Sequence, residues 1–151
     1  MKKNPRIILI TTTIHVPRVL ERYHLIGRDV LCIIAGDKKT PHRDVATFVK
    51  TMSNVEYLSV EDQEKLGYKS SSIIGWNKIM RRNIALLEAL KHGADIVVSV
   101  DDDNIPLDEH YFSDFRAVLS KPYSGLTIQS PHAWINIGDF LSPKVYHRGF
   151  P

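Results

Sequence analysis

The chain has 151 residues, of which 25% are charged and 43% hydrophobic, and a chain of this length buries roughly 68–70% of its unfolded surface, enough for one packed domain. Its net charge of +3 comes from basic residues that are interleaved with acids, with no aromatic stacking platform, which argues against nucleic acid as a partner. No segment approaches the ~18 apolar residues of a membrane span, and the single Cys32 cannot form an internal disulfide, so a core-packing cysteine in a cytoplasmic protein is predicted.

The first half of the chain predicts strands that alternate with helices. An apolar run over 7–10 followed by Thr11, Thr12 and Thr13 predicts a buried strand that ends in hydroxyl groups. A short helix over 17–23 and a second strand over 29–35 follow, and the Gly- and Pro-containing loop over 36–41 stops that strand. A helix over 44–51, a strand over 55–58 and a helical turn over 61–66 complete this half, with Ser59 and Asp62 as a capping pair.

The second half begins with the longest predicted helix, over 74–92, which Gly93 closes. Helical spacing places Asn83 in the middle of an apolar face made by Trp76, Ile79, Met80, Leu87 and Leu90. A buried amide needs partners, so Asn83 either ties down neighbouring backbone or reaches a ligand. A strand over 95–100, a helix over 109–119 capped by Asp108, a strand over 125–129 and an irregular tail over 130–151 follow.

Alternating strands and helices predict a single α/β domain with a mostly parallel, Rossmann-like sheet and helices on both of its faces. Three polar segments come directly after predicted strands, over 11–13, 36–39 and 101–104. The carboxyl ends of parallel strands lie at one edge, where such sheets bind ligands, so we expect these segments to meet there.

The acidic segment Asp101, Asp102 and Asp103 carries the strongest chemical signal. Adjacent like charges repel one another, and carboxylate oxygens suit Mg²⁺ or Mn²⁺ held together with substrate phosphates. On extended backbone Asp101 and Asp103 would share one face and Asp102 the other. We therefore predict Asp103 as the direct metal ligand, Asp101 as a metal or ribose contact, and Asp102 as a structural or sugar contact; the alternative is an acidic turn that caps the next helix.

The turn after the second strand offers a weaker signal. Asp37 can accept hydrogen bonds from a base or ribose, and Lys38 or Lys39 can approach a phosphate, but Gly-Asp turns are common in loops without ligands. The chain has no glycine-rich phosphate loop, dinucleotide fingerprint, zinc-type Cys/His spacing or Gly-x-Ser-x-Gly elbow.

Several motifs in the same order resemble known proteins. The three threonines, the Gly-Asp-Lys-Lys-Thr-Pro loop over 36–41, the segments over 57–68, 81–84 and 92–94, and Asp-Asp-Asp-Asn are similar to STELLO-type glycosyltransferase-like proteins. The Arg-Gly-Phe-Pro sequence over 148–151 resembles the reversibly glycosylated polypeptides, the UDP-arabinopyranose mutases. Both groups are relatives of the GT-A glycosyltransferases, which bind a nucleotide sugar through an Asp-x-Asp metal site.

The resemblance implies roles for residues in these motifs. Thr11 and Thr13 would line the nucleoside pocket, Asp37 would face the base, and Asp101 and Asp103 would serve ribose and metal. Asn83, together with Arg82 or Lys78, would contact the nucleotide or its phosphates.

In the tail the resemblance singles out Arg148, because the mutases are glycosylated on the corresponding arginine. GT-A enzymes also take a metal-binding histidine and a catalytic carboxylate from an acceptor-binding half. Here the candidates are His132, Asp139 and His147, with Asp139 as base or sugar contact if the tail folds over the donor.

We therefore expect a glycosyltransferase that uses Mn²⁺ or Mg²⁺ and a nucleoside-diphosphate sugar, with UDP-sugar favoured and GDP-sugar second, and an unknown acceptor. Metal-assisted departure of the diphosphate would make Asp103 a catalytic residue. A non-catalytic nucleotide-sugar-binding module is the alternative, and a metal-dependent phosphoesterase is the third.

Overall fold

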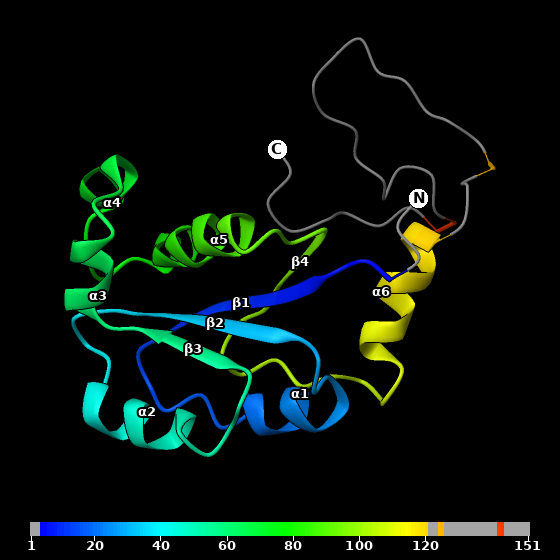
Figure 1. Ribbon diagram of the computed structural model, residues 1–151, viewed down its shortest axis with the longest axis horizontal. Coiled ribbons are helices and arrows are strands. Elements are labelled where there is room, and N and C mark those ends of the chain that lie inside the picture. The colour runs from blue at the N-terminus through cyan, green and yellow to red at the C-terminus, as the bar shows by residue number, and fades with distance from the viewer. Residues whose placement is uncertain (1–3, 121–123, 126–141, 144–151) are drawn as a thin grey trace, which may run out of the picture.

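The computed structural model describes residues 4–120, 124–125 and 142–143. Its centre is a four-stranded, all-parallel sheet in the order β3-β2-β1-β4 (Figure 1). The strands are β1 (Ile7–Thr13), β2 (Leu31–Gly36), β3 (Val55–Leu58) and β4 (Ile96–Ser99). The predicted α/β class and parallel sheet are confirmed, and the arrangement is consistent with a Rossmann-like fold.

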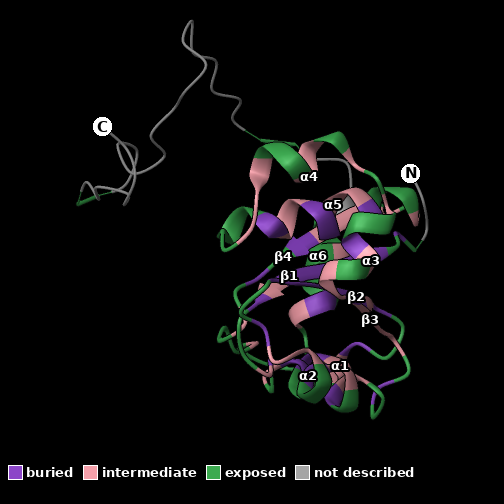
Figure 2. Cartoon of the chain, turned by 90° about the vertical axis from the view of Figure 1, so that its left-hand side faces the viewer, coloured by how far each residue is buried: buried purple, intermediate pink, exposed green. Residues whose placement is uncertain are grey.

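Helices cover both faces of the sheet, as Figure 2 shows. On one face lie α1 (Leu20–Ile26) and α2 (His42–Val49), and α6 (Tyr111–Ser120) adds Phe112 to the same core. On the other face α5 (Arg82–Lys91) packs on β1 and β2. Near it lie α3 (Val60–Lys65), α4 (Lys69–Ile74) and the short 3₁₀ turn η1 (Ile79–Arg81).

Two-sided burial explains the unbroken apolar run of β1. Ile7 and Leu9 pack into the core on the α1 side, while Ile8 and Ile10 pack against α5. Strands covered on both faces are continuously apolar because neither face meets water. Cys32 of β2 is buried in the first of these cores, as predicted, and burial raises the pKa of its thiol.

The register brings the polar segments to one edge. Thr13 of β1 pairs with Gly36 of β2, and Ile10 pairs with Ser99 of β4. The residues that follow these strands, including Asp37 and Asp101, therefore leave the sheet at its carboxyl edge, as expected.

The long helix expected over 74–92 is wrong in its first half. The chain instead forms α4, which the sequence analysis missed, and then turns at Gly75 (φ 68°) and Asn77 (φ 59°) before η1 and α5. Positive φ breaks a right-handed helix, and glycine and asparagine adopt it most readily.

The apolar face expected for that helix is therefore also wrong. Ile79, Met80 and Leu90 are 61%, 53% and 56% exposed, and the buried residues of α5 are Ile84, Ala85, Glu88 and Ala89. The predicted face assumed one continuous helical phase across residues that the turn at 75–77 separates.

The other helices and strands differ from their predicted bounds by at most a few residues, and the predicted capping pair of α3 is present. β3 has its predicted bounds, whereas α1 begins at Leu20, three residues later than predicted, because residues 18 and 19 form a turn. The capping box of α3 is confirmed: Ser59 Oγ accepts from the Asp62 N–H at 3.1 Å and an Asp62 carboxylate oxygen accepts from the Ser59 N–H at 3.0 Å. No helix among the described residues is long and apolar enough to cross a membrane.

Two predicted parts lie outside the described residues. They are the strand over 125–129, apart from residue 125, and the tail over 130–151, apart from residues 142 and 143.

The close contact between α1 and α6 makes Gly27→Ala a test of the packing. A Cβ at Gly27 would lie 2.4 Å from Cε2 of Phe112, so the ring must shift. Overpacking of this kind lowers the free energy of unfolding by about 1–3 kcal/mol. Urea denaturation should show this loss, and Phe112→Leu in the same background should reduce it. An unchanged midpoint for Gly27→Ala would contradict the packing of α6 on α1.

Candidate functional site

A pocket of about 390 Å³ lies at the carboxyl edge of the sheet. Its walls come from the ends of β1 and β2, from the turn after β4 and from the loop between α4 and η1. Seven of the residues proposed from the sequence line it, namely Thr13, Asp37, Lys39, Lys78, Asp101, Asp102 and Asp103. Segments up to ninety residues apart in the chain therefore meet in one cavity, as the parallel topology predicts.

The three aspartates lie in a tight turn and not on extended backbone. The Asn104 N–H donates to the Asp101 carbonyl at 3.3 Å, and Asn104 Oδ1 accepts from the Asp101 N–H at 2.9 Å. The expected alternation, with Asp102 on the opposite face, is therefore wrong, because a turn does not alternate its side chains as a strand does. All three residues line the pocket.

Each aspartate has a different environment. Asp102 accepts a hydrogen bond from Thr13 Oγ1, which joins the turn to the end of β1. Asp101 Oδ1 accepts from Arg82 Nη1 at 2.7 Å. Asp103 is exposed, and no described residue donates a hydrogen bond to its carboxylate. Asp103 therefore has the carboxylate most available for a ligand.

Arg82 lines a second pocket and not the main one. Its Nη1 also donates to the Val100 carbonyl at 3.0 Å, so the guanidinium stays beside β4. A second pocket of about 350 Å³ lies there, and Arg82 and Asp101 line it together with Tyr23 and Tyr111. Arg82 thus contacts the aspartate turn and not the main cavity, where the sequence analysis expected a phosphate contact.

Asp37 has a structural contact that the sequence did not predict. Its carboxylate, in a residue only 2% exposed, accepts N–H groups from Lys38 at 2.6 Å, Asn77 at 2.7 Å and Lys78 at 3.1 Å. These bonds attach the loop after α4 to the end of β2, so Asp37 builds the pocket wall that carries Lys78. The carboxylate that was expected to face a nucleotide base therefore already accepts three backbone N–H groups.

A buried arginine supports the same wall. Arg81 is 0% exposed, and its Nε donates to Gln63 Oε1 at 3.0 Å while Nη1 donates to Ser71 Oγ at 3.0 Å. Its guanidinium carbon lies 3.8 Å from the centre of the Trp76 ring. Burial lowers the pKa of Arg81, whereas the negative charges of Asp37 and Glu64 oppose that shift.

Gln63 connects this arginine to the sheet. Its amide is fully buried, and Nε2 donates to the carbonyls of Gly36 at 2.7 Å and Leu58 at 2.9 Å. Neither Gln63 nor Arg81 was predicted as a site residue, and composition does not distinguish them from exposed polar residues. For Asn77 a signal was present, since Gly75 and Asn77 are the residue types that tolerate positive φ.

The cations near the pocket are Lys39 and Lys78, which line it. Lys38 instead points its Nζ over the Trp76 ring, 5.7 Å from the ring centre. The cavity is therefore lined both by ammonium groups, whose charge attracts phosphate, and by carboxylate oxygens, which attract a metal.

Two expected residues lie away from the cavity. Thr11 is fully buried, and its hydroxyl donates to the Thr12 carbonyl at 3.3 Å, so Thr12 and not Thr11 lines the pocket with Thr13. Asn83 is half-buried in the first turn of α5 and lines neither pocket. His132, Asp139, His147 and Arg148 lie outside the described residues.

No protein-family model matches the chain, and no curated protein matches it either. The chemistry of the pocket therefore rests on its own residues.

Asp37→Ala should destabilise the fold strongly. It removes the acceptor for the three N–H groups, and unsatisfied buried groups lower the free energy of unfolding by about 2–4 kcal/mol in total. Asp29→Ala is the matched control, since it removes only a surface ion pair with Arg116 and should lower that free energy by less than about 1 kcal/mol. Urea denaturation compares the two, and equal losses would contradict the role of Asp37.

The neighbouring Arg81 and Arg82 should differ in the same way. Arg81→Ala leaves Gln63 and Ser71 without their donor and should lower the free energy of unfolding by about 2–4 kcal/mol. Arg82→Ala removes an ion pair with the exposed Asp101, so its loss should stay below about 1 kcal/mol. Thermal denaturation of both variants measures the difference. A more stable Arg81→Ala than Arg82→Ala would refute the buried network.

Proposed function

We propose that the pocket binds a nucleoside-diphosphate sugar together with Mn²⁺ or Mg²⁺, and that the protein is a GT-A-like glycosyltransferase. The observation that carries the proposal is the meeting of the aspartate turn, Lys39 and Lys78 in one cavity at the carboxyl edge of a parallel sheet. That edge is where open α/β sheets bind their ligands.

The aspartate turn fits a hard divalent cation. Asp103 offers a free carboxylate, and Asp101 has one oxygen left beside its contact with Arg82. Carboxylate pairs with substrate phosphates are the usual Mg²⁺ and Mn²⁺ ligands, so Asp103 and Asp101 would hold the ion. When bound, the ion stabilises the charge that develops on a departing diphosphate.

The remaining walls suit the rest of such a donor. Lys39 and Lys78 place positive charge where a diphosphate would lie, and the half-exposed Ile14 and the exposed Ile79 offer apolar surface for a base or sugar ring. Thr13 holds Asp102 in place, so the end of β1 positions the aspartate turn. We favour UDP-sugars over GDP-sugars, an acceptor of unknown class and a cytoplasmic location, which suits the buried free thiol of Cys32.

Asp103→Asn should remove metal-dependent nucleotide binding. Specific binding stabilises the folded state, by about 2.7 kcal/mol when the free ligand is at 100 times its Kd. We expect UDP with Mn²⁺ to raise the Tm of the wild type but not that of Asp103→Asn. Without ligand, the variant and the wild type should have the same Tm. Asp114→Asn, on the exposed side of α6, is the matched control and should behave as the wild type. Equal calorimetric affinity for UDP with and without metal would sink the proposal.

Product analysis separates the alternatives. A glycosyltransferase with Mn²⁺ and a UDP-sugar releases UDP in transfer to an acceptor or slowly to water, and Asp103→Asn abolishes this release. Binding without any UDP release would identify a non-catalytic nucleotide-sugar-binding module. Hydrolysis of a simple phosphate ester without sugar transfer would identify a phosphoesterase.

A further inference from the structure

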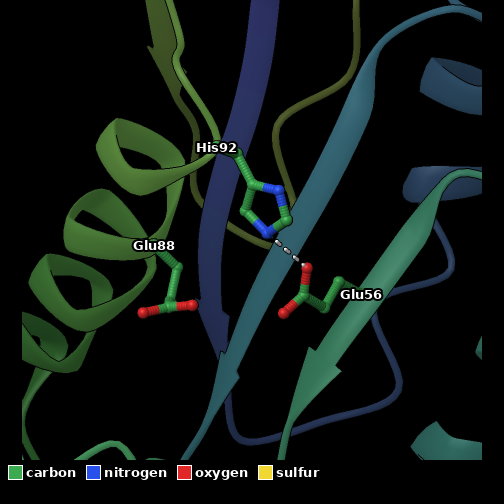
Figure 3. Close-up of side chains that lie close together, drawn as sticks. All are labelled: Glu56, Glu88 and His92. Atoms are coloured by element: carbon green, nitrogen blue, oxygen red, sulfur yellow. Dashed lines mark ion pairs between the residues drawn. The ribbon is translucent and has the colours of Figure 1, made fainter.

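A second group of metal-ligating side chains lies at the far end of α5. Glu56 of β3, Glu88 of α5 and His92 after the end of α5 point toward one another (Figure 3). Each offers one ligand atom, and these atoms all lie within 4.8 Å of one another. Arg82, at the start of the ten-residue helix, contacts the aspartate turn, and Glu88 and His92 follow it by about 9 Å and 15 Å along the helix axis.

Glu88 is the key side chain of this cluster, because it is a buried carboxylate. Its side chain is 7% exposed, and the same oxygen, Oε1, accepts from Tyr68 Oη and lies 3.2 Å from Lys91 Nζ. The other oxygen, Oε2, receives no hydrogen bond from the residues that the structure describes. An oxygen that accepts no protein hydrogen bond can bind a cation without first giving one up, so Oε2 is the free ligand atom of Glu88.

The charges around the cluster also favour a cation. His92 Nε2 lies 3.0 Å from Glu56 Oε2, so the imidazole nitrogen and one carboxylate already face each other. Lys91 is the one cation that contacts Glu88 among the described residues, and its side chain is 62% exposed, which lets it withdraw into water. A metal ion can replace the imidazole proton and bring Oε2 of Glu88 into the same contact.

We propose that Glu56, Glu88 and His92 bind a divalent transition-metal ion such as Zn²⁺. Two carboxylates and one imidazole are ligands for first-row ions, whereas Mg²⁺ and Ca²⁺ take oxygen ligands. Glu88 and His92 stand four residues apart on one side of the helix end, a spacing that lets both reach one ion. Because Glu56 belongs to the outermost strand of the order β3-β2-β1-β4, the ion joins that strand to α5 and stabilises the fold.

Cobalt titration of the full chain, stripped of metal with a chelator, tests the site. Co²⁺ bound by nitrogen and oxygen ligands at low coordination number absorbs visible light, so we expect saturable bands at one equivalent and a Zn²⁺-dependent rise in Tm. His92→Gln and Glu56→Gln should weaken binding. Loss of an outer-shell partner already weakens metal affinity by about 10- to 100-fold, so loss of a ligand should weaken it at least as much.

Matched variants separate this site from other ligands. His110→Gln removes an exposed histidine whose Nε2 lies 3.8 Å from Glu109 and should keep the wild-type cobalt spectrum. Lys91→Met should bind at least as tightly as the wild type. If Glu88→Gln fails to fold, Glu56→Gln and His92→Gln still test the site, because both residues are half-exposed. Absent bands, bands unchanged by His92→Gln, or bands lost in His110→Gln would each overturn the proposal.

Discussion

The carboxylate of Asp37 is the contact on which the pocket depends. Asp37 follows β2, and its carboxylate accepts hydrogen bonds from the N–H groups of Asn77 and Lys78, about forty residues further along the chain. Without it those N–H groups would lose their acceptor, and the left-handed turn at Asn77 would lose its restraint. The loop that brings Lys78 and Ile79 to the pocket is therefore held in place by the buried carboxylate of Asp37. From the sequence Asp37 was expected to contact a ligand, whereas in the structure its carboxylate accepts backbone N–H groups that shape the pocket.

Neighbouring residues of the same charge are likewise divided between structural roles and the pocket. Lys78 lines the cavity, Arg81 is buried against Trp76, and Arg82 pairs with Asp101, although the three form one basic cluster in the sequence. The aspartates divide likewise: Asp102 fastens the turn to Thr13, whereas Asp103 stays available. Charge alone therefore does not identify the groups that meet a ligand; the competing protein donors and acceptors do.

The helix α5 connects the aspartate turn with the cluster of Glu56, Glu88 and His92. Its buried side, formed by Ile84, Ala85 and Ala89, packs on the sheet. Its first turn contacts the aspartate turn through Arg82, and its last turn carries Glu88 beside His92 and Glu56. Because the helix is rigid and packs on β1 and β2, a change in packing on this face would be felt at both of its ends.

The sequence by itself determined the α/β class, the parallel sheet and the edge at which Asp101 to Asp103, Thr13 and Asp37 gather, because burial on both faces imposes continuous apolar strands and parallel strands share their carboxyl ends. Local signals such as the Ser59 and Asp62 capping box were equally readable. Gly75 and Asn77 carried a local signal for the break in the helix expected over 74–92, but only the tertiary structure decided which polar side chains face protein and which line the cavity. Those outcomes depend on partners tens of residues away, which no local pattern encodes.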